Sequence, residues 1–275
     1  MKIIGVIPAR YGSTRLKAKP LIDFLGKPVV QHVFEKAKLS KLLDRVIVAT
    51  DNKMIFDRVI KFGGEAVMTA LSHQSGTDRV SEAASKVSCD IVVNIQGDEP
   101  TITPQLIDEA IKPLLEDNKV YFSTLKTKMN SIEDLLNPNI VKVITDRNDF
   151  AIYFSRLPVP YSLHSPCEAC SQDLSYYFKH IGLYVYKKEF LLKFVSLEAS
   201  DLEKRERLEQ LRALEYGYKI KVVETKGDTV SIDVEEDLER ARQYMSKTLN
   251  PKLETLNKPK TQNSKLKTRR FAFCL

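Results

Sequence analysis

The sequence predicts an α/β fold with a mostly parallel central sheet flanked by helices. Apolar runs at residues 3–7, 45–50 and 90–95 are rich in β-branched residues and lack polar alternation, which is typical of strands buried on both faces. Segments with helical periodicity separate these runs, and that order favours parallel strands joined by right-handed crossovers. The length of 275 residues fits one large domain or two small ones.

The remaining elements follow from local signals. Gly26 and Pro28 turn the chain into a helix, the pair Gly63 and Gly64 ends the next helix, and Gly217 ends a long amphipathic one. The segment from 78 is expected to be a helix with Thr77 or Asp78 as its N-cap. We expect helices at 29–39, 52–60, 78–86, 105–116, 202–216 and 234–245, and further strands at 65–68, 120–126, 151–155, 177–184 and 219–223.

A basic loop directly follows the first strand. Pro8 ends the strand, and Arg10, Arg15, Lys17 and Lys19 come within the next eleven residues of it. The loop leaves the carboxyl end of a buried strand, where open α/β sheets bind ligands. Small neighbouring residues allow close approach, so a polyanion such as a triphosphate is the expected ligand. The alternative is an ordinary solvated basic loop.

Two further loops carry polar groups beside predicted strands or helices. The loop 73–79 contains Gly76 and Arg79 and offers amide, hydroxyl and guanidinium groups that can read a base edge; the alternative is a polar loop that caps a helix. Asp98 follows the strand 90–95, and a single carboxylate there is enough to start a Mg²⁺–nucleotide site. The alternative for Asp98 is a turn residue.

These loops also carry a family resemblance. Pro8-Ala9-Arg10, Ser13-Thr14-Arg15-Leu16 and Lys19-Pro20-Leu21 resemble the signature loop of the sugar cytidylyltransferases, and the likeness extends from residue 1 to about residue 244. It implies a Rossmann-like nucleotide-diphospho-sugar transferase fold. It also implies Mg²⁺-dependent transfer of CMP from CTP to the anomeric hydroxyl of a sugar acid, 3-deoxy-manno-octulosonate (Kdo), which yields CMP-Kdo and pyrophosphate for lipopolysaccharide biosynthesis.

The resemblance assigns roles to individual residues. It implies catalytic roles for Arg10, Lys19 and Asp98, and a metal site formed by Asp98 and Asp233. The residues that it places on the substrates are Ala9, Ser13, Arg15, Gly76, Arg79, Gln96, Arg156, His180, Tyr184, Glu209 and Gln210.

Without the resemblance, several of these residues have simpler interpretations. His180 alone is more often structural than catalytic, and we do not expect it to act as a general base. Glu209 and Gln210 would be a solvated helix face, and Asp233 with Glu236 would be a helix cap. Arg156 could still pair with a sugar-acid carboxylate in bidentate geometry.

The alternative functions differ in what they require of the sequence. A cytidylyltransferase for a related sugar acid, such as sialic acid or an amino-substituted Kdo, remains open. A nicotinamide-dependent dehydrogenase is disfavoured because no Gly-x-Gly-x-x-Gly follows the first strand. The net charge of +7 lies entirely in the tail, where residues from 247 onward include eight basic residues and one acidic residue. No nucleic-acid partner is therefore expected for the body of the chain.

The expected organisation is a single domain over 1–246 and a basic, disordered tail over 247–275. Within the domain, residues from about 150 to 214 are expected to bind the sugar and to form a homodimer. No long apolar run or signal peptide is present, so we expect no stable membrane insertion and a cytoplasmic location. Cys167 and Cys170 have Cys-x-x-Cys spacing without a second pair, and we interpret them as incidental thiols.

Overall fold

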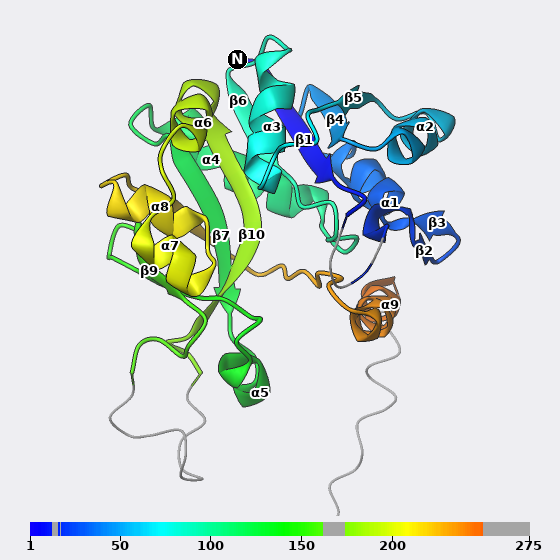
Figure 1. Ribbon diagram of the computed structural model, residues 1–275. Coiled ribbons are helices and arrows are strands. Elements are labelled where there is room, and N and C mark those ends of the chain that lie inside the picture. The colour runs from blue at the N-terminus through cyan, green and yellow to red at the C-terminus, as the bar shows by residue number, and fades with distance from the viewer. Residues whose placement is uncertain (13–15, 17, 162–173, 250–275) are drawn as a thin grey trace, which may run out of the picture.

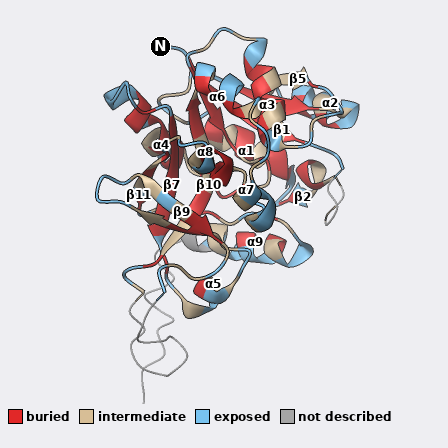
Figure 2. Cartoon of the chain, turned by 60° about the vertical axis from the view of Figure 1, so that its left-hand side comes forward, coloured by how far each residue is buried: buried red, intermediate tan, exposed pale blue. Residues whose placement is uncertain are grey.

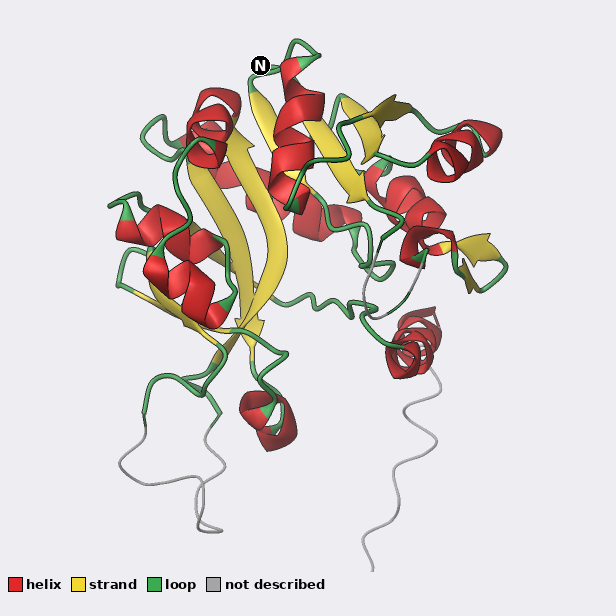
Figure 3. Cartoon of the chain, viewed as in Figure 1, coloured by secondary structure: helices red, strands yellow, loops and turns green. Residues whose placement is uncertain are grey.

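The computed structural model describes residues 1–12, 16, 18–161 and 174–249. Its centre is a nine-stranded sheet in the order β11-β7-β10-β6-β1-β4-β5, and β8 and β9 join it beside β10 (Figures 1 and 3). The strands β6, β1, β4 and β5 run parallel, and so do β7 and β11, whereas β10 is antiparallel to both of its neighbours β6 and β7. The predicted α/β fold is confirmed. The strands are β1 (Ile3–Ala9), β4 (Arg45–Thr50), β5 (Ala66–Met68), β6 (Ile91–Asn94), β7 (Phe122–Lys128), β8 (Lys142–Thr145), β9 (Ala151–Ser155), β10 (Phe178–Lys187) and β11 (Lys221–Thr225), with a separate hairpin of β2 (Asp23–Phe24) and β3 (Lys27–Pro28).

Helices cover both faces of this sheet, and the strands between them are mostly buried (Figure 2). One core layer includes residues of α1, α2 and α4, and the opposite layer includes residues of α3, α6 and α8. Because β1, β4 and β6 bury both faces, their runs of Val and Ile need no polar alternation. The helices are α1 (Val29–Ala37), α2 (Lys53–Lys61), α3 (Gly76–Ser85), α4 (Pro104–Glu116), α5 (Ile132–Leu136), α6 (Lys188–Val195), α7 (Asp201–Glu206), α8 (Gln210–Glu215) and α9 (Glu235–Leu249).

The carboxyl ends of β1 and β6 lie together and bring two loops into contact. At Gly97, a Cβ atom would lie 2.6 Å from the carbonyl oxygen of Pro8, a distance that no side chain tolerates. Glycine is therefore required where the loop after β6 passes the end of β1. This close approach fixes the relative position of Pro8 and Gly97, which both line the first cavity of the candidate active site.

The chain after β11 crosses from the β7–β10 side of the sheet to the side of α1 and enters α9 (Figure 1). Ile232, in this crossing segment, packs in a small core with Phe24, Val29 and two residues of α9. The amide of Ile232 donates to the carbonyl oxygen of Asp98 at 2.9 Å. The crossing segment thus carries Asp233 to the end of β6, although more than 130 residues separate the two in the sequence.

Two expectations about the elements are corrected. The predicted helix at 202–216 is two helices, α7 and α8, because Arg207 adopts a left-handed conformation with φ of 53°. The predicted final helix at 234–245 begins at Glu235 and continues to Leu249 as α9, which takes in the first three residues of the segment from 247 onward. The rest of the tail, and also Cys167 and Cys170, lie outside the described residues. Among the described residues, no helix is both long enough and apolar enough to cross a bilayer.

Candidate active site

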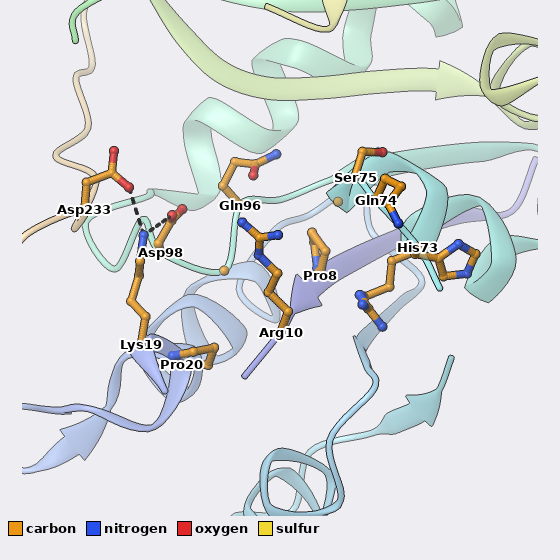
Figure 4. Close-up of a pocket in the computed structure, with 13 residues that line it drawn as sticks. Pro8, Arg10, Lys19, Pro20, His73, Gln74, Ser75, Gln96, Asp98 and Asp233 are labelled. Carbon is orange, nitrogen blue, oxygen red and sulfur yellow. Dashed lines mark hydrogen bonds and ion pairs between the residues drawn. The ribbon is translucent and has the colours of Figure 1, made fainter. Parts of the chain in front are cut away.

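A first cavity opens at the carboxyl ends of β1 and β6, beside the N-terminus of α3 (Figure 4). It combines a basic side, which carries Arg10 and Lys19, with the acidic residues Asp98 and Asp233. Arg10 is exposed and projects into this cavity. We call it the nucleotide-side cavity; its lining residues are Pro8, Arg10, Lys19, Pro20, His73, Gln74, Ser75, Gly76, Arg79, Gln96, Gly97, Asp98 and Asp233.

Lys19 joins the two acidic residues of this cavity. Its Nζ donates to Asp98 Oδ2 at 2.8 Å and to Asp233 Oδ1 at 2.9 Å (Figure 4). Lys19 opens a short 3₁₀ helix and is only 8% exposed. Burial opposes the charge of Lys19, but the adjacent Asp98 and Asp233 outweigh burial and raise the pKa of its ammonium group. The structure therefore brings together three predicted site residues that are far apart in the sequence.

The position of Asp233 is fixed by the start of α9. The amides of Asp233 and Val234 donate to Asp237 Oδ2 at 2.9 and 3.0 Å. Asp237, rather than the pair Asp233 and Glu236, caps this end of the helix. The carboxylate of Asp233 is consequently available to face Lys19, which the capping interpretation of Asp233 had not allowed.

The N-terminus of α3 forms one wall of the nucleotide-side cavity. Ser75, and not Thr77 or Asp78, is its N-cap, and Ser75 and Asp78 form a reciprocal capping box. Gly76 faces Pro8, since a Cβ atom at Gly76 would lie 3.5 Å from the Pro8 ring. The helix therefore begins two residues earlier than predicted and presents its first turn to the cavity.

Arg79 lies in the same wall but is 3% exposed. Its guanidinium donates to Asp51 Oδ2 at 2.6 Å, to the hydroxyl of Thr69 and to the carbonyl oxygen of Ala70. These bonds tie α3 to the chain segments that follow β4 and β5. The geometry indicates that Arg79 shapes the cavity wall, and a direct contact with a base stays a prediction.

A second, larger cavity lies next to the first, towards β10 and α8. We call it the sugar-side cavity, after the role predicted for its residues. Gln96, Asp98 and Asp233 line both cavities. Four other predicted substrate contacts, Arg156, His180, Tyr184 and Gln210, line the sugar-side cavity only.

His180 and Tyr184 lie on β10; His180 is buried and Tyr184 is half-buried. Burial lowers the pKa of His180 to about 3, so its imidazole is neutral at ordinary pH. His180 Nε2 lies 2.9 Å from Thr124 Oγ1. The Tyr184 hydroxyl donates to Gln210 Oε1 at 3.1 Å, and burial raises the pKa of Tyr184. A pKa this low makes His180 a weak base, which agrees with the expectation that it is no general base.

Arg156 is held by main-chain oxygens. Its guanidinium donates to the carbonyl oxygens of Glu206 at 2.6 Å, Pro138 at 2.9 Å and Arg207 at 3.4 Å. One N–H on each terminal nitrogen remains for another partner. Arg156 is thus fixed in position at the edge of the sugar-side cavity by the turn between α7 and α8.

The remaining predicted residues fall into two groups. Ala9 ends β1 beside Thr50 and is buried between Pro8 and Arg10; those two residues line the nucleotide-side cavity, and Ala9 does not. Glu209 immediately precedes α8 and lies beside the sugar-side cavity. Ser13 and Arg15 lie outside the described residues.

Comparison with known proteins decides the family. The sequence profile described as cytidylyltransferase matches residues 4–220 of this chain. The chain belongs to the cytidylyltransferase family. It is 49% identical over 253 residues to 3-deoxy-manno-octulosonate cytidylyltransferase of Geotalea uraniireducens, covering 90% of this chain and 100% of that protein. It is 50% identical over 244 residues to the protein of the same name from Geotalea daltonii, covering 87% of this chain and 96% of that protein.

A solved structure agrees with this assignment. The cytidylyltransferase described here superimposes on the structure of CMP:2-keto-3-deoxy-manno-octonic acid synthetase complexed with CTP with a TM-score of 0.82 and 38% identity. The match covers 90% of this chain and 100% of that chain. The likeness therefore extends over most of the chain.

The site of this cytidylyltransferase fits a divalent cation in its donor chemistry. Asp98 and Asp233 already share one positive group, the ammonium of Lys19, so the pair is arranged around a cation. Among the described residues, no group of three or more His, Cys, Asp or Glu side chains could hold a metal ion. Mg²⁺ uses one or two protein carboxylates and takes its other ligands from water and phosphate, so two acids suffice.

The cytidylyltransferase site includes a charged group that sequence reasoning missed. Glu99 is 7% exposed, and burial, followed by the nearby charge of Asp98, raises its pKa to about 7. Lys179 faces the same cavity, and its Nζ donates to Asp228 Oδ1 at 2.7 Å and to the Thr229 carbonyl oxygen at 2.9 Å. Glu99 stood in the motif Gln-Gly-Asp-Glu-Pro, but nothing in the sequence showed that Lys179 and Asp228 would surround it.

Proposed function

We propose that this cytidylyltransferase transfers CMP from CTP to the anomeric hydroxyl of Kdo and releases pyrophosphate, which supplies CMP-Kdo for lipopolysaccharide biosynthesis. The names of its relatives and of the CTP-bound structure support the two substrates. One observation carries the proposal in this chain: two adjacent cavities share a wall formed by Gln96, Asp98 and Asp233. A donor nucleotide and an acceptor sugar bound in these cavities would meet at that wall.

The reaction requires stabilisation of negative charge rather than a protein nucleophile. The anomeric oxygen forms a bond to the α-phosphorus as the bond to the bridging oxygen of pyrophosphate breaks, and the hydroxyl proton passes to the solvent. Arg10 and Lys19 line the nucleotide-side cavity, where positive groups would stabilise the transition state and the leaving pyrophosphate. Burial lowers the pKa of His180 to about 3, which makes it too weak a base for us to assign it the proton.

Asp98 and Asp233 would hold Mg²⁺ at this wall. A bound Mg²⁺ supplies Lewis-acid polarisation of a phosphoryl oxygen. The chain itself contributes the fixed spacing of the two acids, which follows from the hydrogen bond between Ile232 and the Asp98 backbone and from the cap formed by Asp237.

On the sugar side, we propose that Arg156 pairs with the carboxylate of Kdo through its two remaining N–H groups. Gln96, His180, Tyr184, Glu209 and Gln210 would contact the sugar hydroxyls. Their orientations are restricted, because His180 and Gln210 are buried and the other three side chains each have a hydrogen-bond partner in the protein. Such preorganised hydrogen bonding is what discrimination among similar sugar acids requires.

We also propose a homodimer. Exposed apolar side chains gather in the predicted dimerisation segment and around it: Ile152 is 58% exposed, Leu157 70%, Tyr161 82% and Tyr176 70%. Light scattering coupled to size-exclusion chromatography would give twice the monomer mass. A monomer at micromolar concentration would contradict the dimer.

Pyrophosphate release from CTP tests the proposed function. The purified full-length chain is given CTP and Mg²⁺ with Kdo, with sialic acid or with an amino-substituted Kdo, each at equal concentration. We expect the highest kcat/KM with Kdo. Faster turnover of either other acid would move the assignment to that substrate, and no release with any acid would overturn it.

A further inference from the structure

A line of buried hydrogen bonds connects the shared wall of the two cavities to Glu209. Gln96 Nε2 donates to Asn94 Oδ1 at 3.2 Å, and Asn94 Nδ2 donates to Thr77 Oγ1 at 3.3 Å. Thr77 Oγ1 in turn donates to Glu209 Oε2. Asn94 is 1% exposed and Thr77 is 2% exposed. The line therefore crosses from β6 to α3 and on to the residue before α8, and its two middle members are shielded from water.

The chemistry of the last member sets the direction of every bond in this line. An ionised carboxylate only accepts hydrogen bonds, so Thr77 must use its single hydroxyl proton on Glu209. The oxygen of Thr77 can then only accept from Asn94, which forces the amide nitrogen of Asn94 towards Thr77. Asn94 consequently turns its oxygen to Gln96, and Gln96 turns its nitrogen to Asn94. Bonds aligned in this way strengthen one another in a low dielectric.

The consequence for Gln96 is a fixed orientation of its side-chain amide. Asn94 accepts from one of the two hydrogens on Nε2, so Gln96 offers a ligand its Oε1 atom and one remaining N–H, and among the described residues none donates to Oε1. Gln96 lines both cavities, whereas Asn94 and Thr77 line neither. A ligand at this place therefore meets an acceptor and a donor whose positions are fixed by Asn94.

We propose that Thr77 and Asn94 are positioning residues that hold the side-chain amide of Gln96 in one orientation, so that its Oε1 and its remaining N–H meet the hydroxyl groups of the acceptor sugar at fixed places. This role rests on the reaction proposed above, because it assumes a polyhydroxylated sugar acid in the sugar-side cavity. Thr77 and Asn94 act through Gln96 and touch no substrate themselves. Loss of either residue lets the amide of Gln96 rotate, so that its donor and acceptor leave the places where they meet the sugar hydroxyls.

Two features separate this role from simple core packing. The side chain of Thr77 also interacts with the hydroxyl of Tyr186. Glu209 Oε1 is buried, and within the described part of the chain no donor lies within hydrogen-bond distance of it, although Arg212 Nη2 lies 3.9 Å away. The line thus runs from Gln96, which lines both cavities, to the carboxylate of Glu209, which lines neither.

The test uses the full-length enzyme and the variants Thr77→Val, Thr77→Ser, Gln96→Ala and Thr77→Val with Gln96→Ala. Valine keeps the shape of threonine without the hydroxyl, and serine keeps the hydroxyl. We expect Thr77→Val to raise the KM for Kdo about ten-fold, the usual result of leaving one buried polar group unpaired, and to change the KM for CTP less than about two-fold. Thr77→Ser is expected to stay within about two-fold of the unsubstituted enzyme for both substrates.

The double variant decides whether Thr77 acts through Gln96. If it does, Thr77→Val adds less than about two-fold to the KM for Kdo once Gln96 is alanine. A ten-fold effect that persists in the Gln96→Ala background, or a rise in the KM for CTP as large as that for Kdo, would overturn the proposal. Melting temperatures identify any variant that has lost its fold. If Thr77→Val is such a variant, the kinetic constants of Thr77→Ser are compared with those of the unsubstituted enzyme instead.

A second measurement does not depend on turnover. Side-chain amide signals of Asn94 and Gln96 in ¹⁵N NMR spectra are assigned by their loss in Asn94→Ala and Gln96→Ala. We expect both to shift in Thr77→Val and to return in Thr77→Ser. Unchanged amide signals in Thr77→Val would refute the coupling of Thr77 to Gln96 along the line of hydrogen bonds. Failure of the unsubstituted enzyme to use Kdo would refute the proposed function, and the amide signals would then decide the coupling by themselves.

Discussion

Lys19 stands where a divalent cation would bind, and its removal should tighten metal binding in the absence of nucleotide. The ammonium contacts Asp98 and Asp233 at 2.8 and 2.9 Å, so a metal ion that takes both carboxylates must first displace it. In Lys19→Met the side chain keeps most of its length and loses its charge. The two acids then lose the ammonium that they share, and a divalent ion relieves their repulsion.

The magnitude follows from the exposure of the three side chains. Hydrogen bonds between charged groups contribute about 1.5–3 kcal/mol each when buried. The Lys19 side chain is 11% exposed, but those of Asp98 and Asp233 are 31% and 37% exposed, so solvent screens both contacts. We therefore assign the pair about 1–2 kcal/mol in total, which corresponds to roughly five- to thirty-fold in the dissociation constant.

Mn²⁺ is a suitable probe because its electron paramagnetic resonance signal distinguishes free from bound ion. The titration is done without CTP, since the triphosphate binds the metal itself. Lys126→Met is the matched control: Lys126 is also a buried lysine paired with an aspartate, Asp149, but it lines neither cavity. Equal or weaker Mn²⁺ binding by Lys19→Met than by the unsubstituted enzyme would refute the competition between the ammonium and the metal.

Two other predictions concern backbone contact and pH. Gly97→Ala places a Cβ atom 2.6 Å from the Pro8 carbonyl oxygen and should lower the free energy of unfolding by about 1–3 kcal/mol. We expect a lower melting temperature together with lost activity. An unchanged melting temperature would show that the two loops can separate freely. Burial lowers the pKa of His180 from 6.5 to about 3. Between these pH values the unfolded chain therefore binds more protons than the folded chain. The free energy of unfolding should consequently fall as the pH drops from 6.5 towards 3. Urea titrations across this range should show a smaller pH dependence in His180→Gln, and an equal dependence would exclude His180 as its source.

The sequence reveals the central strands because burial on both faces leaves a continuous apolar run. β8 gives no such run, because Lys142 lies at its start and is fully buried. The Nζ atom of Lys142 donates to the carbonyl oxygens of Asn137, Ile140 and Arg156 at 2.8, 2.7 and 2.9 Å, and burial lowers the pKa of Lys142 to about 8. Only the folded chain brings these three carbonyls together, so the residue looked like a surface lysine in the sequence.

The break between α7 and α8 has a similar origin. Residues 202–216 have a continuous amphipathic pattern, and Arg207 has no local reason to adopt a left-handed conformation. Arg212 of α8 reaches back to Glu203 of α7 with bonds of 2.7 and 2.6 Å. This pairing across the turn, together with the bonds from Arg156 to the carbonyl oxygens of Glu206 and Arg207, stabilises the break. Tertiary contacts therefore override the helical pattern.

For the candidate site too, the sequence shows the local motifs but not how they come together. Each motif can be recognised because glycine, proline and charged residues follow a predicted strand or precede a helix. The contact between Lys19 and Asp233 could not be predicted in this way, since the two residues are 214 positions apart and the segment before α9 brings them together only in the fold. The line from Gln96 to Glu209 was equally hidden, because Asn94 and Thr77 look like ordinary polar residues at the ends of a strand and a helix.

The charge of the cluster links metal binding to nucleotide binding. Asp98, Asp233 and Lys19 together carry one negative charge, and an ion that displaces Lys19 leaves a buried ammonium without its partners. A triphosphate in the nucleotide-side cavity offers that ammonium new acceptors, so nucleotide and metal should each tighten the binding of the other by the same factor. Lys19→Met has no ammonium group that needs new partners. The part of the mutual increase in metal and nucleotide affinity that depends on Lys19 should therefore be absent. The effect is measured as the Mn²⁺ affinity of the unsubstituted enzyme and of Lys19→Met, each with and without a non-hydrolysable CTP analogue. If the analogue raises the Mn²⁺ affinity of both proteins by the same factor, the metal and the nucleotide interact only with each other and not through Lys19.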